Sequence, residues 1–425
     1  MKISLVQPHY FNVWEALGLA YIAAHARERF RGRLEIDFFQ GFFDPDDEIL
    51  AGAKDSDLVG FSCTSPAFRH AVRLARGLKK LNPGIRTVFG GFHPSAVPRD
   101  CLEEEAVDQV VVGEGEEAFL RILEGDAGRI VRGGHFRDFD RALPDRALVK
   151  NGRAIDLCQR QIGRRITSFA SGRVCPFRCV FCAEKAVTGL RGRANPVRER
   201  EPGHLLEEIQ RAQRDWRLDG FKFVDATWNT SAEKVMAFCE EKIRRGLVLP
   251  WEANVHAALA SREMLRAMKA AGCRQINVGC ESGSPRILRD MRKGLTVERI
   301  VQTFAWARAA GLERRAFFLI GMPNETVADI RRTERLVERI QPEVFGITII
   351  CPFPGCDLYD PRTMKDYDWS AADEYTNDCW STPHLSNADL KRWQSYLMDR
   401  FPARLAWHNR LLRGRRPARE AEERL

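Results

Sequence analysis

The sequence lacks any long apolar run. Nowhere in its 425 residues does a hydrophobic stretch approach the roughly 20 residues that a membrane-spanning helix needs. Its start, MKISLVQPHY, holds one Lys and then turns polar, which is typical of a first β-strand and not of a signal peptide. We therefore expect a cytoplasmic protein with no membrane partner.

The sequence also lacks a basic block interleaved with aromatic residues, the pattern that marks a nucleic-acid track. The formal net charge is +9, and much of it is Arg spread along predicted helices. This spread is typical of a solvated surface, so we expect no nucleic-acid partner. An acidic substrate remains compatible with the charge. No internal repeat is present.

The twelve cysteines do not predict a disulfide framework, because a cytoplasmic chain of this length keeps its thiols reduced. Three of them lie within eight residues, and the other nine are scattered. We expect most of the scattered cysteines to be small buried hydrophobic side chains.

Residues 1–125 alternate short apolar segments with amphipathic ones, which predicts an α/β domain with a parallel sheet covered on both faces. Strands are expected over 2–7, 34–39, 57–63, 86–91 and 108–115, and helices over 14–30, 45–54 and 67–82. Ligands of such sheets bind beyond the carboxyl ends of the strands. The candidate ligand-binding residues at those ends are Ser62, Thr64, Gly90, Gly91, His93, Gly113 and Glu114.

Residues 126–163 are charged and weakly periodic, and we interpret them as a linker. Over 164–360 a second series predicts six strands, each followed by a helix: 165–171, 221–226, 251–255, 275–281, 316–321 and 343–350. Six such units favour a partial barrel over a complete eight-fold one. Residues 361–425 form a small helical extension, with Ser386 as a helix N-cap, Asp389 in the first turn and a solvated tail over 414–425.

Cys175, Cys179 and Cys182 form a CxxxCxxC run directly after the strand predicted at 165–171. A loop at the carboxyl end of a strand is where a βα barrel places its chemistry. Soft thiolates select iron–sulfur clusters or zinc. A structural zinc ion would need a fourth ligand, and the next candidates are His204 and Cys239, which lie farther along the chain. Both kinds of metal centre stay open from the spacing alone.

The CxxxCxxC spacing, with the aromatic Phe181 before the last cysteine, resembles the signature of the radical S-adenosylmethionine (SAM) superfamily. The resemblance implies a [4Fe–4S] cluster on three cysteines, whose open iron binds SAM. Reductive cleavage of SAM then gives methionine and a 5′-deoxyadenosyl radical. It also implies an electron donor such as a flavodoxin or ferredoxin, and a small-molecule substrate.

Further motifs between 165 and 360 resemble the same superfamily in the expected order. Gly279–Ser284 followed by Lys293 resembles its GxESGS…KG stretch, residues 319–326 resemble GxPxET, and 352–355 resemble a PyPGT turn. The resemblance implies that Glu281 binds the SAM ribose. Phe181, Asp225, Ser282, Lys293 and Gly321 are the other residues that it places near SAM. The alternative for Glu281 is a carboxylate at a helix N-terminus, and Asn324 or Thr326 could simply begin a helix.

Residues 17–24, 90–95 and 113–116 resemble the cobalamin-binding domain that precedes the barrel in one radical SAM class. The resemblance implies a flavodoxin-like, Rossmann-type domain, with the corrinoid over the strand ends and its nucleotide tail near Ser62, Thr64, Gly90 and Gly91. The DxHxxG motif, which supplies a histidine to cobalt in other corrinoid proteins, is absent. His93 could instead be a turn residue, and Trp14 and Glu15 could fill the cofactor space.

The combined resemblance predicts four parts: a cobalamin-binding-like domain over 1–125, a linker over 126–163, a partial (β/α)6 TIM-like barrel over 164–360 and an extension over 361–425. It favours a cobalamin-dependent C-methyltransferase, in which methylcobalamin carries the methyl group. The alternatives are a radical dehydratase, epimerase or cyclase, and a non-catalytic zinc-stabilised binding protein. Substrate-site candidates near the predicted strand ends are Asp225, Trp228, Asn229, Glu252, Asn254 and Arg315.

Overall fold

The structure is a computed structural model that describes the chain except for residues 12, 14, 188–196, 374 and 405–425. Trp14 and the predicted tail therefore lie outside the described residues. Two compact units are present: the first comprises 1–176, 182–224 and 352–371, and the second comprises 177–181, 225–351 and 372–425.

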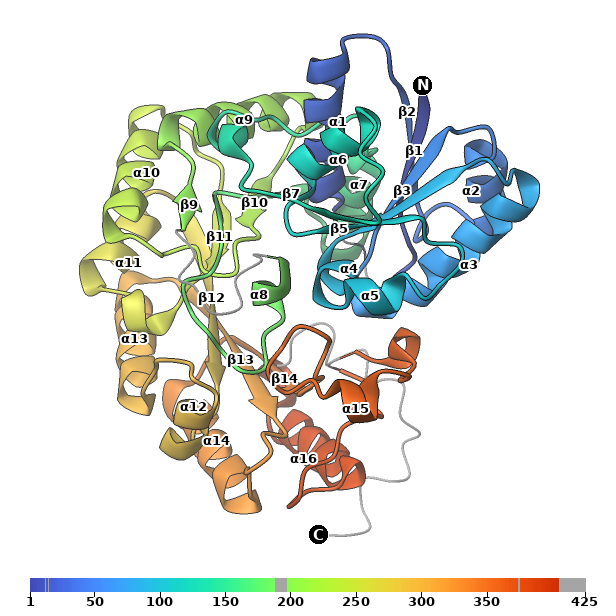
Figure 1. The fold of residues 1–425 in the computed structure, drawn as a ribbon. Helices are drawn as coiled ribbons and strands as arrows, with labels where there is room; N and C mark the ends of the chain where they lie inside the picture. The colour runs from blue at the N-terminus through green and yellow to red at the C-terminus, as the bar shows by residue number, and fades with distance from the viewer. Residues whose placement is uncertain (12, 14, 188–196, 374, 405–425) are drawn as a thin grey trace. The chain divides into compact units, whose positions relative to one another are not determined.

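The N-terminal sheet confirms the predicted parallel α/β architecture (Figure 1). Its hydrogen-bonded order is β2-β1-β3-β4-β5-β6, with Val6 beside Phe39 and Phe61. The inner strands are buried on both faces, as their continuous apolar sequences require. The strands are β1 (Lys2–Gln7), β2 (Glu35–Gln40), β3 (Leu58–Ser62), β4 (Arg86–Gly90), β5 (Gln109–Val112) and β6 (Ile130–Arg132).

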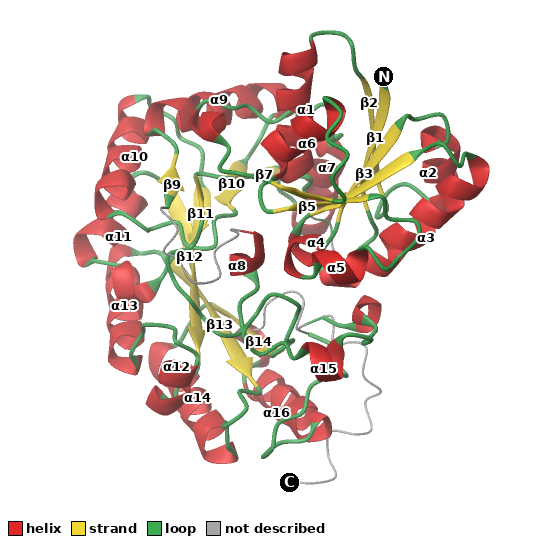
Figure 2. Ribbon diagram, in the orientation of Figure 1, coloured by secondary structure: helices red, strands yellow, loops and turns green. Residues whose placement is uncertain are grey.

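Helices cover both faces of this sheet (Figure 2). One apolar cluster joins the sheet to α1 and α6, and a second joins it to α2, α3 and α5. The helices are α1 (Leu17–Phe30), α2 (Asp46–Ala53), α3 (Ser65–Leu81), α4 (Phe92–Ala96), α5 (Pro98–Cys101) and α6 (Gly115–Leu123). This arrangement leaves the carboxyl ends of β1, β3, β4 and β5 on a common edge.

Residues 126–163, which we interpreted as a linker, contain regular structure. The strand β6 pairs with β5 at the edge of the sheet, Val111 lying beside Val131. The helix α7 (Asn151–Ile162) packs against the first strand of the second sheet. The segment's charged residues hid both elements, because an edge strand of three residues and a half-exposed helix show little periodicity.

The second sheet is also parallel, with the order β14-β13-β12-β11-β10-β7, and it confirms the six strands predicted for a partial barrel. The strands are β7 (Ile166–Phe169), β10 (Gly220–Phe223), β11 (Trp251–Asn254), β12 (Cys273–Glu281), β13 (Glu313–Ile320) and β14 (Val344–Ile349). A separate antiparallel pair joins β8 (Gly172–Arg173) to β9 (Arg198–Glu199).

Helices α10 (Ala232–Arg244), α11 (Arg262–Ala270), α13 (Val297–Ala310) and α14 (Val327–Ile340) pack side by side along the second sheet (Figure 1). The shorter or flanking helices are α8 (Glu184–Val187), α9 (Pro202–Trp216), α12 (Pro285–Asp290), α15 (Pro361–Met364) and α16 (Asn387–Arg400). The predicted C-terminal helix is α16, and Ser386 and Asp389 form its capping box. No helix in the described part of the chain is long and apolar enough to cross a membrane.

Candidate active site

The cysteine loop follows β8 in the first unit. The fully buried Ser171 lies between β7 and β8. None of the twelve cysteines, all of which the structure describes, forms a disulfide, and this includes Cys175, Cys179 and Cys182. Val174, directly before the first of them, has φ +81°. A β-branched residue adopts such a φ only when its surroundings impose it. The chain entering the loop is therefore held in a strained conformation.

Two ion pairs hold the strand that leads into this loop. Arg173 donates to Glu116 at 2.5 Å and to Glu114 at 2.8 Å, and its guanidinium lies 4.5 Å from the ring centre of Phe139. Arg198, on the paired strand β9, donates to Glu114 as well. Burial disfavours the charged guanidinium of Arg173, but the two carboxylates outweigh it and raise its pKa above the ordinary value.

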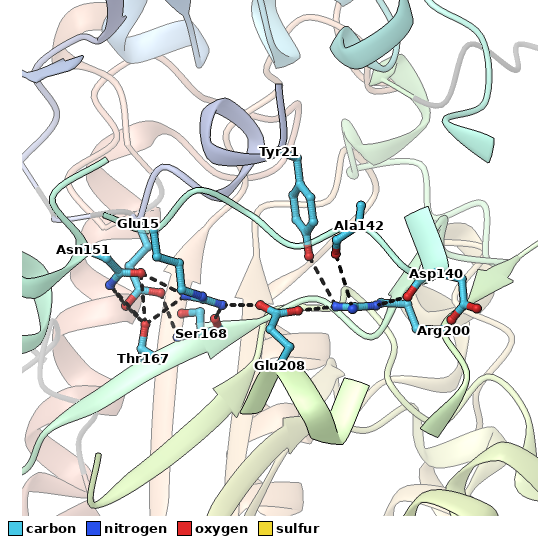
Figure 3. Close-up of polar contacts among 10 residues, drawn as sticks. Glu15, Tyr21, Asp140, Ala142, Asn151, Thr167, Ser168, Arg200 and Glu208 are labelled. Atoms are coloured by element: carbon cyan, nitrogen blue, oxygen red, sulfur yellow. Dashed lines mark hydrogen bonds and ion pairs between the residues drawn. The ribbon is translucent and has the colours of Figure 1, made fainter. Parts of the chain in front are cut away.

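A buried polar network supports β7 from the other side (Figure 3). Glu208 of α9 pairs with Arg200 and, at 2.9 Å, with Arg146. Arg146 also donates to the carbonyl of Ser168 in β7 at 2.8 Å. Glu15 accepts from the Ser168 amide at 2.7 Å. Each charge in this network has a partner, so its burial is tolerated. Glu15 and Arg146 hold β7 directly, and Glu208 in turn holds Arg146.

Glu15 is thus committed to β7, and its carboxylate does not fill space at the strand ends of the N-terminal sheet. Its other oxygen accepts from the hydroxyl of Thr167 at 2.7 Å. Trp14, the other residue that could fill the cofactor space, lies outside the described residues.

The short helix α8, which follows Cys182, packs against α4. Gly355 has φ +100°, and a Cβ there would lie 2.6 Å from the Cβ of Ala186 and 3.2 Å from that of Ala96. Glycine at this turn lets α8 and α4 approach. The chain leaving the third cysteine therefore lies against the carboxyl edge of the N-terminal sheet, within one compact unit.

In the second unit, the centre of the cysteine loop rests on His256. The rings of Phe177 and His256 are parallel, with centroids 3.6 Å apart. Burial and nearby Lys293 lower the pKa of His256 to about 3, so its ring is neutral at physiological pH. The amide of Val180 donates to the carbonyl of Met291 at 3.1 Å. These contacts fix the middle of the loop beside the segment that carries Lys293.

Glu281 and Lys293 meet at the carboxyl end of β12. The ammonium of Lys293 donates to Oε1 of Glu281 at 2.7 Å, and both side chains are nearly buried. Glu281 has φ +58°, at a register shift between β12 and β13. A Cβ at Gly279 would lie 2.4 Å from Glu281 Oε1 and 2.9 Å from Lys293 Nζ. A side chain at position 279 would therefore displace the ion pair that folds back over the strand, which explains the glycine in the G-x-E…K spacing.

Other predicted SAM-site residues have structural partners. Ser282 is fully buried, and its hydroxyl accepts from the amide of Ser284 at 3.1 Å. Gly321 has φ +102° and accepts from the indole of Trp380 at 2.6 Å. Its amide donates to Glu325, whose pKa burial raises to about 8. The expected helix start at Thr326 is confirmed by a capping box with Asp329.

Phe181 and Asp225 keep positions compatible with the predicted site. The ring of Phe181 lies 5.9 Å from the ammonium of Lys293. Asp225 is nearly buried, and its carbonyl accepts from the amide of Asn254 at 2.8 Å. These two residues and the Glu281–Lys293 pair all belong to the second unit.

The strand ends of the N-terminal sheet separate into two groups. The hydroxyls of Ser62 and Thr64 make no hydrogen bond to another described residue, and Thr64 is exposed, so both can bind a ligand. Gly91 has φ +98°, and a Cβ there would lie 2.8 Å from the carbonyl of Cys63. The small residues Ser62, Thr64, Gly90, Gly91 and Gly113 thus form an edge that suits a large planar ligand.

His93 and Glu114, by contrast, are already engaged. His93 is nearly buried, its Nδ1 lies 3.0 Å from the hydroxyl of Ser65, and burial lowers its pKa to about 4. Glu114 is held by Arg173 and Arg198. The turn-residue alternative for His93 agrees with this geometry.

Two of the substrate-site candidates pack in the core. Trp228 is 1% exposed and lies against Trp251 and Phe238. Asn229 is fully buried, and its side chain accepts from the amide of His256 and donates to the carbonyl of the same residue. The remaining candidates on β11 and β13, which are Glu252, Asn254 and Arg315, are only half-buried.

Sequence reasoning did not find Arg173, Arg146, Glu208 or His256. Their partners lie far along the chain, and a lone charged residue in an amphipathic segment resembles any surface residue. The one available signal was the pair of arginines flanking the cysteine loop at Arg173 and Arg198.

The described residues contain no group of three or more His, Cys, Asp and Glu side chains arranged round a single metal ion. Three cysteine thiols in one loop match the donor set of a [4Fe–4S] cluster. Ligation by all three cysteines stays a prediction.

Two models of known protein families match two separate parts of the chain. The radical SAM superfamily model matches residues 170–337, and the B12 binding domain model matches residues 5–123. The chain is 27% identical over 360 residues to an uncharacterized methyltransferase, PH0819, of Pyrococcus horikoshii, covering 81% of this chain and 77% of that protein. It is 24% identical over 396 residues to the anaerobic magnesium-protoporphyrin IX monomethyl ester cyclase of Rubrivivax gelatinosus, covering 84% and 69%.

A solved structure shares the fold. The radical SAM methyltransferase TsrM from Kitasatospora setae, with cobalamin and a [4Fe–4S] cluster bound, superposes with a TM-score of 0.68 at 18% identity. The match covers 84% of this chain and 76% of that one.

Proposed function

Because this chain is a radical SAM protein that carries a B12-binding domain, we propose that it is a cobalamin-dependent C-methyltransferase. The observation that carries the proposal is the presence, in one chain, of three free loop cysteines, the Glu281–Lys293 pair and an N-terminal sheet with small residues along its carboxyl edge. When bound, the cluster and SAM supply the radical, and cobalamin carries the methyl group.

Each set of residues has its own part in this proposal. Cys175, Cys179 and Cys182 hold the cluster. Glu281 accepts from the SAM ribose hydroxyls, while Lys293 keeps its carboxylate oriented. Ser62 and Thr64 donate to the corrinoid's nucleotide tail. The paired charges at Arg173 and Glu116 fix the loop that enters the site.

The electron that starts SAM cleavage would come from a small redox protein such as a flavodoxin or ferredoxin, as the resemblance to the superfamily implies. The substrate is a small molecule that binds within the barrel. The 5′-deoxyadenosyl radical would take a hydrogen atom from an unactivated carbon of the substrate, giving 5′-deoxyadenosine, and cobalamin would supply the methyl group that replaces it.

The test uses anaerobically purified and reconstituted full-length protein. Incubation with SAM labelled at its methyl carbon, cobalamin and a reductant should give 5′-deoxyadenosine and label on cobalamin. The ultraviolet–visible spectrum should show the broad absorption of an iron–sulfur cluster together with the bands of a corrin. The variant with Cys175, Cys179 and Cys182 replaced by Ala should retain corrin bands and form no 5′-deoxyadenosine. Failure of the parent protein to take up cobalamin would overturn the methyltransferase proposal.

A second candidate is a radical cyclase, dehydratase or epimerase. The similarity to an anaerobic monomethyl ester cyclase over 84% of the chain favours it specifically. The same incubation separates the two: formation of 5′-deoxyadenosine without label on cobalamin supports this second function.

A further inference from the structure

We propose that Arg315 binds an oxyanion group of the substrate, a carboxylate or a phosphate, inside the barrel. The inference rests on the proposed function, since it assigns a substrate class to the same radical SAM barrel. It concerns the second compact unit only.

Arg315 lies on the inner face of the second sheet. It is in register with Asn277 of β12, which is in register with Asn254 of β11. Successive residues of a strand point to opposite faces. The neighbouring residues on the other face, Ile276 and Ala316, are fully buried, whereas Arg315 and Asn277 are half-buried. The inner face is therefore polar and incompletely covered, unlike the outer face that packs on helices.

The guanidinium of Arg315 has no bonding partner in the described part of the chain. Its Nε is fully buried and donates no hydrogen bond, and none of its nitrogens forms an ion pair there. Burial lowers its pKa, and Tyr375 and Glu252 counter this only through longer-range attraction. A desolvated cation without an acceptor is costly unless a ligand supplies one.

The position of the guanidinium favours a planar contact with an anion. It lies over the ring of Phe317, 4.7 Å from the centroid, and Phe317 is two residues nearer the carboxyl end of β13. The side chain therefore extends toward the carboxyl end of β13. An arginine stacked on a ring leaves the edge of its guanidinium free, and this edge matches a carboxylate or phosphate bidentately.

The polar side chains next to Arg315 are neutral or acidic, so they do not compete with it for an anion. Gln275 donates to Glu252 at 3.1 Å and to Asn277 at 2.7 Å, so the carboxylate of Glu252 is turned toward an amide. Among these side chains Arg315 carries the positive charge, and an anionic ligand would pair with it.

The oxyanion has two sources, the substrate and the carboxylate of SAM. The backbone of Arg315 is in register with Asn277, and Glu281 is in register with Phe318, three residues later on β13 and thus about 10 Å along the strand. Lys293 is the cation that already lies beside Glu281. Because Arg315 begins farther from the carboxyl ends of the strands than Glu281 does, we favour the substrate over SAM as the source of the oxyanion.

The test measures binding of small anions to the reconstituted holoenzyme by calorimetry, in the presence of saturating SAM. Malonate and inorganic phosphate are the anionic probes, and malonamide is the neutral counterpart of malonate. The variants are R315Q, R315K and, as a matched control, R274Q, which removes an exposed arginine from the neighbouring strand β12. The affinity for SAM is measured separately for each.

The parent protein should bind at least one anion tenfold or more tightly than malonamide. R315Q should lose that preference, R315K should keep part of it, and R274Q should match the parent. Equal binding of anions and malonamide by the parent, or an unchanged preference in R315Q, would overturn the proposal. A tenfold loss of SAM affinity in R315Q, with anion binding unchanged, would instead assign Arg315 to SAM.

Circular dichroism and iron content show whether R315Q folds. If R315Q does not fold, R315K is compared with the parent protein in its place. Anion binding does not require turnover. A parent that binds anions through Arg315 but forms no 5′-deoxyadenosine would therefore contradict the proposed function and leave this inference standing.

Discussion

Lys293 holds Glu281 in place at the carboxyl end of β12, with 2.7 Å between Nζ and Oε1. The pair folds back over Gly279, where any side chain would displace it. The carboxylate is therefore oriented before a ligand arrives, which is what recognition of ribose hydroxyls requires.

Replacement of Glu281 by Gln should weaken SAM binding by about 1–3 kcal/mol, because the charge-assisted acceptor is lost while the shape is kept. Equilibrium binding of SAM to the reconstituted protein measures the effect. Glu298→Gln, in the first turn of α13, is the matched control and should bind as the parent does. Unchanged binding in Glu281→Gln would support the helix-terminus alternative.

Replacement of Cys175, Cys179 and Cys182 by Ala should abolish iron uptake, since no other thiols are expected to hold the cluster. Iron analysis after reconstitution and the yield of 5′-deoxyadenosine are the measurements. Cys239→Ala changes a buried thiol elsewhere and should keep full iron. Full iron in the triple variant would disprove the assignment.

Glu116→Gln should destabilise the protein by about 1–3 kcal/mol, because the nearly buried guanidinium of Arg173 loses one of its two carboxylate partners and keeps the other, Glu114. The double variant Arg173→Met, Glu116→Met should recover part of that loss, since no unpaired charge remains. Urea denaturation measures both. A double variant less stable than Glu116→Gln would show that the pair contributes through more than charge compensation.

Stability should fall as the pH drops from about 6.5 toward 4, in part because of His93. Burial lowers the pKa of His93 from 6.5 to about 4 in the folded state. Above pH 6.5 the residue is neutral in both states, and between the two values only the unfolded state binds the proton. The loss is on the order of 3 kcal/mol.

The His93→Phe variant should show a smaller loss of stability over this pH range, because Phe can pack against Phe68 without binding a proton. His135→Phe removes an exposed histidine and serves as the control. Denaturation curves at pH 7, 5.5 and 4.5 provide the comparison. Identical pH dependence in the parent and His93→Phe would contradict the assignment.

Bound cobalamin should receive no histidine ligand from this chain. The DxHxxG motif is missing, and the ring of His93 is buried against Ser65. Electron paramagnetic resonance of the cob(II)alamin form, with protein labelled by ¹⁵N-histidine, distinguishes a protein imidazole from the cofactor's own nitrogen. A change of the superhyperfine splitting on labelling would disprove this prediction.

The amino-acid sequence was sufficient for features that depend on neighbouring residues. Apolar runs of four to eight residues identified the strands of both sheets except β6, because the inner strands of the N-terminal sheet are buried on both faces and those of the second sheet have one buried face. The capping box of Ser386 and Asp389 was readable because its hydrogen bonds join residues three apart. The spacing of the three cysteines and of Gly279, Glu281 and Lys293 is likewise local, and it was sufficient to identify the superfamily.

Only the tertiary structure decided which charges are paired. Glu114 and Arg198 are 84 residues apart, and Arg146 and Glu208 are 62 apart. The same structure showed that Arg315 has no partner among the described residues, although the sequence presents it like any other arginine. The physical reason is that burial and pairing depend on which strands and helices meet, and a pairing between distant segments leaves no periodicity in either one.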